Sequence, residues 1–337
     1  MTPAKLWLQI FLAGFAIIVA MLVTTLATTV PYGDLSRIGQ ISDNEFGWQL
    51  AQPHVEPQYL RASPVSEADI LVIGDSFSMT YRWQSVLTRA GYRVTTIYWG
   101  QIGEALCQDF DAWLDSAGFR GKLVVLESVE RLLGDRLAKT QNCAKMQKPF
   151  ESKTEPFVSP PEQVPGFELN WKGKLTTGYK TYRNTQKAKE SAGETLASKQ
   201  TWARPVVDGC SMFSSRLCNK ALFFKDDDDN GEITPENVRQ MRAFSDAHPT
   251  RSIMWMVIPN KTTIYVKPDH SKDFVTAFRD AGLGPDLFTF AMEQKTKVRD
   301  FYFPNDTHLS MHGQLILGQR MLESVRKILP EPRAKAS

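Results

Sequence analysis

Three polar residues of the chain have the types and the order that nucleophilic acyl chemistry needs. Ser76 lies in the segment Gly-Asp-Ser-Phe-Ser at 74–78, and Asp306 and His308 lie in the segment Asp-Thr-His at 306–308. A serine hydroxyl becomes an effective nucleophile when a histidine takes its proton and a third group orients that histidine. The sequence therefore predicts Ser76 as the nucleophile, His308 as the base and Asp306 as the orienting group.

The sequence around Ser76 predicts a strand, a tight turn and a helix. Residues 70–73 (Ile-Leu-Val-Ile) form a short apolar run that is typical of a buried central strand. Apolar residues then recur at spacings of three or four from Tyr81 to Ala90, which predicts a helix of about four turns that ends at Gly91. In an open α/β sheet such a turn faces the ligand crevice, and free N–H groups at a helix start favour developing negative charge there.

The rest of the chain adds further strands and helices in alternation. Strands are predicted at 93–98, 122–126 and 252–258, and helices at 106–117, at 236–248 and over the apolar positions 315–328. Alternating strands and helices favour an α/β fold with a central parallel sheet covered by helices on both faces.

These motifs resemble those of the SGNH hydrolase superfamily. The Gly-Asp-Ser-x-Ser segment near the start of a domain and the Asp-His motif near its end carry the resemblance. The Asp-Thr-His form, Glu130-Arg131, and Ile-Pro-Asn-Lys at 258–261 followed by Tyr265 resemble the alginate O-acetyltransferase branch, which modifies exopolysaccharides. The resemblance covers roughly residues 65–330, in patches.

The resemblance implies a fold, a reaction and a site. The fold would be an SGNH-type (flavodoxin-like) three-layer sandwich over residues 67–330, with an insertion at about 134–220. The reaction would transfer acetyl groups through an acyl-serine to hydroxyls of an extracytoplasmic polysaccharide, with a multi-span membrane-bound O-acyltransferase as acetyl donor. The backbone N–H groups of Ser76 and Gly100 would form the oxyanion hole, although Gly100 is also explained by a tight turn.

Two basic residues near the predicted crevice are candidate substrate ligands. Arg131 follows the third strand and Lys261 follows the strand at 252–258. Arg131 would hold a substrate carboxylate or hydroxyl, or else form a salt bridge with Glu130.

Two other functions use the same residues. Water in place of a sugar hydroxyl would make the protein an esterase with the same triad. The Gly-x-Asn-Asp motif expected after the third strand is replaced by Glu-Ser-Val-Glu at 127–130, which is compatible with a non-catalytic polysaccharide-binding assembly subunit. A formal net charge of +3 and the lack of nucleic-acid motifs give no support for nucleic-acid binding.

The N-terminal segment 1–30 is predicted to be a transmembrane anchor or a signal peptide. No charged side chain occurs between Leu6 and Val30, and a helix of this length can cross a hydrocarbon core of about 30 Å. Lys5 before it places the rest of the chain outside the cytoplasm by the positive-inside rule. We therefore expect a single-pass inner-membrane protein with a periplasmic domain, a linker at 31–66 and a short tail at 331–337.

The four cysteines suit an oxidising compartment. Cys210 and Cys218 are close in sequence, so a local bridge between them is the preferred pairing, and Cys107 would then pair with Cys143. Three pairings are formally possible.

The remaining motifs lie in or near the insertion. Basic residues interleaved with aromatic ones at 134–209 would suit sugar stacking and attraction of an anionic polymer, or a solvated loop. Asp226, Asp228 and Asn230 match positions 1, 3 and 5 of a calcium loop, but the twelfth position is Asn237, and an acidic turn that caps the helix beginning near Pro235 is the preferred explanation. No other cofactor is expected.

Four further histidines are not assigned to catalysis. His54 lies in the predicted linker, His248 at a helix end, His270 in a loop, and His312 at the start of the last helix. His308 and His312 are spaced four apart, as metal ligands on a helix would be, but Asp-Thr-His at 306–308 precedes the helix.

Overall fold

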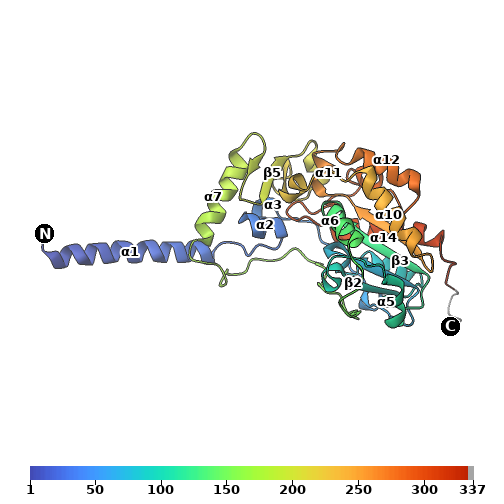
Figure 1. Ribbon diagram of the computed structural model, residues 1–337. Helices are drawn as coiled ribbons and strands as arrows, with labels where there is room; N and C mark the ends of the chain where they lie inside the picture. Colours follow the sequence, from blue (N-terminus) through green and yellow to red (C-terminus); the bar gives the residue numbers. More distant parts are fainter. Residues whose placement is uncertain (333–337) are drawn as a thin grey trace. The chain divides into compact units, whose positions relative to one another are not determined.

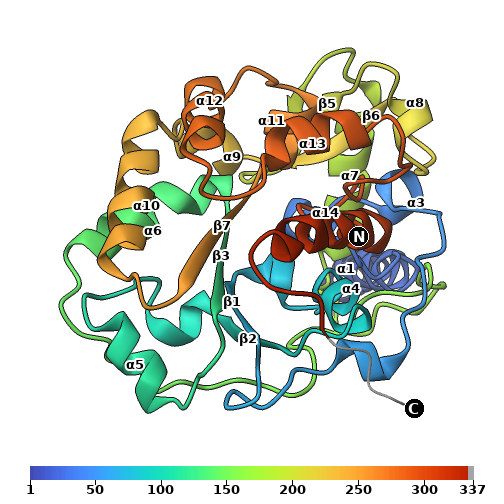
Figure 2. The ribbon, with the colours of Figure 1, turned by 90° about the vertical axis from the view of Figure 1, so that its right-hand side faces the viewer.

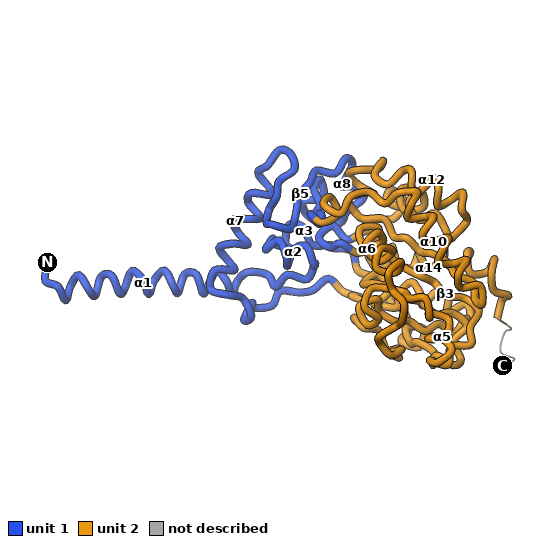
Figure 3. Tube along the Cα trace, in the orientation of Figure 1, with its two compact units in different colours: residues 1–50, 164–225, 303–307 blue, residues 51–163, 226–302, 308–337 orange. Residues whose placement is uncertain are grey.

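The computed structural model describes residues 1–332 and divides into two compact units (Figure 3). Unit 1 contains residues 1–50, 164–225 and 303–307. Unit 2 contains residues 51–163 and 226–302 and the chain from His308 onward. Only the first two residues of the predicted tail 331–337 are among the described residues.

Unit 2 is built on a four-stranded parallel sheet in the order β2-β1-β3-β7 (Figure 2). The strands are β1 (Ile70–Gly74), β2 (Val94–Tyr98), β3 (Leu123–Val129) and β7 (Ser252–Ile258). The α/β class and the parallel sheet predicted from the sequence are confirmed. In the register Gly74 pairs with Tyr98 and Val129 with Ile258, so the carboxyl ends of all four strands meet at one edge.

Helices cover both faces of this sheet. Alternate residues of a strand point to opposite faces, and in β1 Leu71 and Ile73 join one hydrophobic cluster while Ile70 and Val72 join another. Helices α5 (Phe110–Ser116), α6 (Glu130–Gln141), α10 (Pro235–Ala247) and α12 (Lys272–Ala281) contribute to the first cluster. Helices α4 (Gln84–Arg89) and α14 (Met311–Arg326) contribute to the second, and Figure 2 shows the two groups on opposite sides of the sheet.

The remaining short elements of unit 2 lie in its connections. They are the 3-10 helices η1 (Pro57–Leu60), η2 (Ser76–Ser78) and η3 (Trp99–Ile102) and the α-helices α9 (Asp226–Asp229), α11 (Lys261–Tyr265) and α13 (Leu287–Gln294).

The helix predicted after Ser76 is shorter than expected. The chain forms only η2 and, after a break, α4, because Tyr81 adopts a left-handed conformation with φ of 55°. The buried Tyr81 hydroxyl donates a hydrogen bond to the Lys153 carbonyl at 2.8 Å. A long-range contact therefore overrides the local helical pattern.

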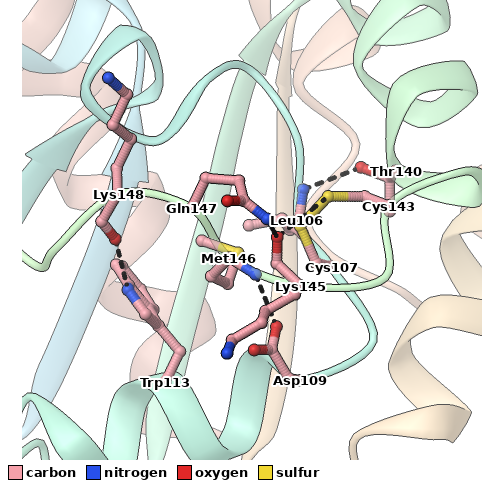
Figure 4. Close-up of a disulfide and its surroundings, with 10 residues drawn as sticks. All are labelled: Leu106, Cys107, Asp109, Trp113, Thr140, Cys143, Lys145, Met146, Gln147 and Lys148. Atoms are coloured by element: carbon pink, nitrogen blue, oxygen red, sulfur yellow. Dashed lines mark hydrogen bonds between the residues drawn. A yellow bond between two sulfur atoms is a disulfide. The ribbon is translucent and has the colours of Figure 1, made fainter.

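Both disulfides have the pairing preferred from the sequence. Cys107 is bonded to Cys143 and Cys210 to Cys218. Figure 4 shows the first bridge beside the Leu106 N–H, which donates to Thr140 Oγ1 at 3.1 Å. This bridge holds residue 107 in a loop, so α5 begins at Phe110 and not at the predicted residue 106. Closing a loop of this size restricts the unfolded chain and stabilises the fold by roughly 4 kcal/mol.

Unit 1 begins with α1 (Pro3–Leu26), an apolar helix long enough to cross a membrane. Its apolar side chains are exposed along its length. Together with the two disulfides, this helix indicates a secreted or extracytoplasmic domain that follows an anchor or a signal segment. It is drawn at the N-terminal end of the chain in Figure 1.

The rest of unit 1 is a small mixed structure. It has an antiparallel sheet in the order β4-β5-β6, and the elements are α2 (Asp34–Gly39), α3 (Asp43–Phe46), α7 (Thr177–Glu190), β4 (Thr195–Leu196), β5 (Thr201–Pro205), α8 (Gly209–Met212) and β6 (Lys220–Phe224). Leu35 and Phe46 pack against Ala203 and Leu222. The first part of the segment expected as an irregular linker at 31–66 thus contains helices that help to form a core, and α7 lies where the sequence shows no clear periodicity.

Two helical glycines provide a matched test of the packing in unit 2. A Cβ added at Gly318 in α14 would lie 2.6 Å from the Trp83 carbonyl oxygen, whereas one added at Gly134 in α6 meets no atom within 4 Å. We expect Gly318→Ala to destabilise the protein by about 1–3 kcal/mol through overpacking. Gly134→Ala should be neutral or stabilising by up to about 1 kcal/mol, through helix propensity.

Thermal unfolding of the purified proteins, followed by circular dichroism, measures both effects. A Gly318→Ala protein that melts at or above the wild-type temperature would contradict the close approach of α14 to the chain at Trp83.

Candidate active site

The structure brings Ser76 and His308 together. His308 Nε2 lies 2.7 Å from Ser76 Oγ, although the two residues are 232 positions apart in the sequence. Ser76 is the first residue of η2, directly beyond the carboxyl end of β1, and its side chain is exposed. The two residues that the sequence predicts as nucleophile and base therefore lie within hydrogen-bonding distance of each other in unit 2.

His308 is positioned by the segment that leads into α14. Tyr302 and Leu309 form an antiparallel bridge, and the Ser310 N–H donates to the Phe301 carbonyl at 3.0 Å. Ser310 also caps α14, since its Oγ accepts from the Gly313 N–H at 3.1 Å. The His308 ring lies 4.7 Å from the buried Phe77 ring. Its approach to Ser76 is thus set by backbone pairing and by ring packing.

The turn that carries Ser76 is closed by the residue before it. Asp75 Oδ1 accepts a hydrogen bond from the Phe77 N–H at 3.1 Å, and the Asp75 carbonyl accepts from the Ser78 N–H at 3.0 Å. Asp75 is therefore the N-cap of η2. This cap fixes the backbone on both sides of the nucleophile.

Asp75 is itself buried and has a cationic partner. Its Oδ2 accepts from Arg136 Nη1 at 2.9 Å and from the Val129 N–H at 2.8 Å. Burial alone would raise the pKa of Asp75, but the charge of Arg136 and the hydrogen bonds hold that pKa below its usual range. Arg136 also donates to Ser128 Oγ and to Glu104 and lies over the Trp99 ring. A charged carboxylate is thus stabilised behind the nucleophile.

Glu127 completes this network from inside strand β3. Its Oε2 accepts from the Asp75 N–H at 2.7 Å and from Ser78 Oγ at 2.8 Å, and the side chain is fully buried. Burial raises the pKa of Glu127 well above its usual range, and the nearby Asp75 charge raises it further. Of the two carboxyl groups, Glu127 is therefore the one that binds a proton more readily. A Cβ at Gly74 would lie 2.5 Å from Ser78 Oγ, so this packing also requires glycine there.

The register of the sheet places both predicted oxyanion donors at one edge. Gly74 pairs with Tyr98 across β1 and β2, and Ser76 and Gly100 each follow two residues later. Gly100 is the second residue of η3 and Ser76 is the first of η2. Backbone N–H groups in the first turn of a helix have no partner within that helix, so both positions suit oxyanion binding.

Asp306 belongs to unit 1, whereas His308 belongs to unit 2. Within unit 1, Asp306 Oδ2 accepts from the Asp34 N–H at 2.9 Å. Asp34 in turn accepts from the Thr307 N–H and hydroxyl, at 2.9 and 2.6 Å. These bonds hold the loop at 306–307 against the start of α2. The role of Asp306 toward His308 stays a prediction.

Arg131 and Lys261 lie just beyond the carboxyl ends of β3 and β7. Arg131 Nη1 lies 3.3 Å from Asp227 and 3.4 Å from Asn260 Oδ1, so its acidic partner is not the predicted Glu130. Glu130 instead accepts from the Asn260 N–H and two hydroxyls. Lys261 is buried at the start of α11. Contact of either basic residue with a substrate stays a prediction.

The acidic run does not adopt the predicted calcium-loop conformation. Residues 226–229 form the helical turn α9, in which Asp226 and Asp228 point to different sides. Asp228 pairs with Lys267 at 2.6 Å, and the buried Asp227 accepts from Thr262 Oγ1. The alternative, an acidic turn that caps the following helix, is wrong about the cap, because Thr234 caps α10 and the acidic run ends at Asp229.

The other histidines have structural surroundings. His248 is buried at the end of α10, with Nδ1 3.0 Å from Asp111. His54 is exposed beside Glu162, and His312 lies 3.0 Å from the Ala51 carbonyl. His270 lies 3.7 Å from Glu130.

Sequence reasoning missed three residues of the network behind Ser76, namely Ser78, Glu127 and Arg136. The sequence contained a signal for Glu127, because Glu127 and Ser128 directly continue an apolar run that is typical of a buried strand. A carboxyl group in such a strand must be neutral or paired. The sequence does not show that Asp75 and Arg136 are the groups that interact with the Glu127 carboxyl group.

Comparisons of the chain with protein-family models, with curated proteins and with solved structures found no match in any of the three.

The protonated state of Glu127 can be tested by substitution. Glu127→Gln keeps a neutral side chain of the same shape, so we expect wild-type stability within about 1 kcal/mol at about pH 4, where the unfolded state of wild type also largely holds this proton. Glu127→Ala removes the acceptor of the Asp75 N–H and of the Ser78 hydroxyl, which should cost about 1–3 kcal/mol for each unsatisfied group. Urea unfolding of the three proteins at about pH 4 measures these differences without the cost of proton uptake.

A protonated Glu127 also predicts that the difference in stability between wild type and Glu127→Gln depends on pH. The folded state binds the Glu127 proton more tightly than the unfolded state, so the stabilisation is complete below the ordinary pKa of 4.5 and is lost as pH rises through the raised folded-state pKa. Wild type should therefore lose stability relative to Glu127→Gln as pH rises from 4.5. Asp75 is present in both proteins, so its opposite dependence largely cancels. A difference that is constant with pH, or that grows in favour of wild type, would refute a protonated Glu127.

Proposed function

We propose that the protein is an O-acyltransferase that transfers acetyl groups through an acyl-serine intermediate to hydroxyls of an extracytoplasmic polysaccharide. The observation that carries this proposal is the 2.7 Å contact between His308 Nε2 and the exposed Ser76 Oγ at the carboxyl edge of a parallel sheet. Ligands of open α/β sheets bind at that edge. A serine activated in this way is suited to accept an acyl group from a donor.

The proposed first step forms the acyl-enzyme. Ser76 Oγ attacks the carbonyl carbon of the acyl donor while His308 takes the serine proton. The N–H groups of Ser76 and Gly100 stabilise the oxyanion, an interaction worth about 2.7–4 kcal/mol per donor in comparable sites. The tetrahedral intermediate then collapses, and His308 returns the proton to the leaving group of the donor.

The second step releases the acyl group to the acceptor. A sugar hydroxyl attacks the acyl-serine carbonyl, His308 takes the hydroxyl proton, and that proton passes to Ser76 Oγ as the new ester leaves. Attack by water instead yields free acetate, so the same residues would make an esterase. The proposal assigns Asp306, two residues before His308 in the sequence, to orient the imidazole.

The fold supports the family resemblance on which the acetyl chemistry rests. The strand order β2-β1-β3-β7 is the start of the order 2-1-3-4-5 that is common among doubly wound flavodoxin-like sheets. Helices cover both faces of this sheet, and Gly-Asp-Ser follows its central β1 strand. We therefore propose an SGNH-type domain of the alginate O-acetyltransferase branch, with β4 and β5 in its insertion and β6 directly after it.

The N-terminal helix supports an extracytoplasmic location. We propose that α1 is an inner-membrane anchor with Lys5 on the cytoplasmic side and both units in the periplasm. A single span cannot carry an acetyl group across the membrane, so a multi-span membrane-bound O-acyltransferase would supply it. Arg131 and Lys261 stay candidates for polysaccharide contacts.

The reaction can be tested on the full-length protein in detergent with an activated acetyl ester as donor. We expect acetylated sugar, detected by mass spectrometry, when oligosaccharide acceptors are added, and none with Ser76→Ala. Ser116→Ala is the matched control, because Ser116 is exposed and bonds only the Ala112 carbonyl of its own helix. Ser76-dependent acetate without acetylated sugar would make the protein an esterase. No product at all from a folded protein would favour a binding subunit.

The assignment of Asp306 predicts a large, specific loss of activity. Asp306→Asn should lower kcat by about 10⁴, as a misplaced histidine tautomer does in other triads. The amide oxygen can still accept from the Asp34 N–H, so the loop should persist. Thr307→Val removes the neighbouring hydroxyl bond to Asp34 and leaves the Asp306 carboxylate intact. An equal loss in both variants would show that Asp306 acts only by holding the loop.

A further inference from the structure

The segment 170–178 of unit 1 is hydrogen-bonded to the last turn of α1. The Asn170 N–H donates to the Leu26 carbonyl at 3.1 Å, and Thr25 Oγ1 donates to the Leu175 carbonyl at 2.9 Å. The same hydroxyl accepts from the Gly178 N–H at 3.1 Å, and Thr25 is buried by these contacts. The turn at 170–178 is therefore held at the point where the apolar helix ends.

Two glycines make this contact possible. A Cβ at Gly178 would lie 2.6 Å from the Thr24 backbone, and a Cβ at Gly173 would lie 2.8 Å from Thr25 Cγ2. Close approach of two backbones requires residues without a side chain. Figure 1 shows α7 beginning beside the C-terminal end of α1. The close contact between α1 and the segment 170–178 therefore depends on glycine at both positions.

Large apolar and aromatic side chains are exposed on either side of this contact. Trp171 is 74% exposed and Tyr182 65% exposed. The exposed members of the group are Phe167, Leu169, Trp171, Leu175, Tyr179 and Tyr182. We call residues 167–183 the juxtamembrane surface. Side chains of this kind gathered on one exposed segment mark an interaction site.

The charge of the juxtamembrane surface is positive. Its exposed basic residues are Lys172, Lys174, Lys180 and Arg183, and Glu168 is the acidic residue of the segment. Basic side chains near an apolar span are attracted to anionic lipid headgroups by about 1 kcal/mol each. Trp and Tyr prefer the same depth, because their rings are apolar and their N–H and O–H groups remain hydrated.

We propose that the juxtamembrane surface binds the headgroup region of the bilayer that α1 crosses, with a preference for anionic phospholipids. The 24 residues of α1 span about 36 Å, slightly more than a hydrocarbon core of about 30 Å. The last turn of α1 therefore lies at headgroup depth, and the segment fastened to that turn lies there with it. The proposal does not depend on the acyltransferase reaction.

This position favours lipid over polysaccharide as the partner of these aromatic residues. Stacking on sugar rings would use the same side chains, but it gives no reason for backbone contacts with a membrane-spanning helix. The consequence for the protein is a second attachment to the bilayer, in which α1 provides the anchor and residues 167–183 fix the orientation of unit 1 on it.

The test uses full-length protein in phospholipid vesicles with a single environment-sensitive label. All four native cysteines form disulfides, so an introduced cysteine carries the label. Trp171→Cys and Tyr182→Cys report on the surface. Val207→Cys, 83% exposed between β5 and α8, is the control in the same unit. Leu12→Cys in α1 verifies that the helix is inserted.

We expect nitroxide-labelled lipids with the spin label near the headgroup to quench the labels at 171 and 182 several-fold more than the label at 207. The quenching should be stronger in vesicles with 30% phosphatidylglycerol than in pure phosphatidylcholine. Lys172→Glu with Lys174→Glu should remove that difference. Labels at 171 and 182 that are quenched no more than the label at 207, while residue 12 is buried in lipid, would overturn the proposal. Protection of those labels by oligosaccharide instead of lipid would overturn it as well.

Discussion

The buried charge of Asp75 is the constraint on which the site depends. An ionised carboxylate inside the protein is costly unless it is paired and hydrogen-bonded. Here Arg136 supplies the opposite charge, backbone N–H groups supply hydrogen bonds, and the raised pKa of Glu127 favours its neutral form. Asp75 also caps the turn of Ser76. The interactions that stabilise the charge of Asp75 therefore also fix the position of Ser76.

The parallel sheet concentrates polar chemistry at a single edge. All four strands end there, and Ser76, Gly100, Glu130 and Asn260 follow directly after β1, β2, β3 and β7. The strand interiors pack between two helical layers and are largely apolar. Buried polar groups also occur within them: Glu127 Oε2 accepts from Ser78 Oγ, whereas Glu127 Oε1 has no partner among the described residues.

Unit 1 supports a location close to a membrane for the proposed reaction. Its apolar helix, its disulfide between Cys210 and Cys218 and the juxtamembrane surface at 167–183 all suit a domain held close to the outer face of a membrane. An acyltransferase that receives its acyl group from a membrane-embedded donor would need such a position. In this proposal the physical requirements of the two units are complementary: one supplies the nucleophile, and the other supplies the orientation relative to lipid.

Features that depend on local patterns could be predicted from the order of the residues alone. The apolar runs at 70–73 and 252–258, the helix before His248, the anchor-like N-terminus and the preferred cysteine pairs are all present in the structure. The contact between Ser76 and His308 was also predicted, since few histidines were available and the motifs around both residues are short. Hydrophobic periodicity and residue type are local quantities, and they can be read without knowing the fold.

Features that depend on partners distant in the sequence could not be predicted in this way and became visible in the folded protein. The helix predicted from Tyr81 is broken because its hydroxyl reaches Lys153, and β3 continues through Glu127 because Asp75 and Ser78 bond its carboxyl group. The partner of Arg131 is Asp227, almost a hundred residues away, and not the adjacent Glu130. A buried polar group is stable only beside its complement, and the complement is chosen by the packing of the sheet and its helices, not by neighbours in the sequence.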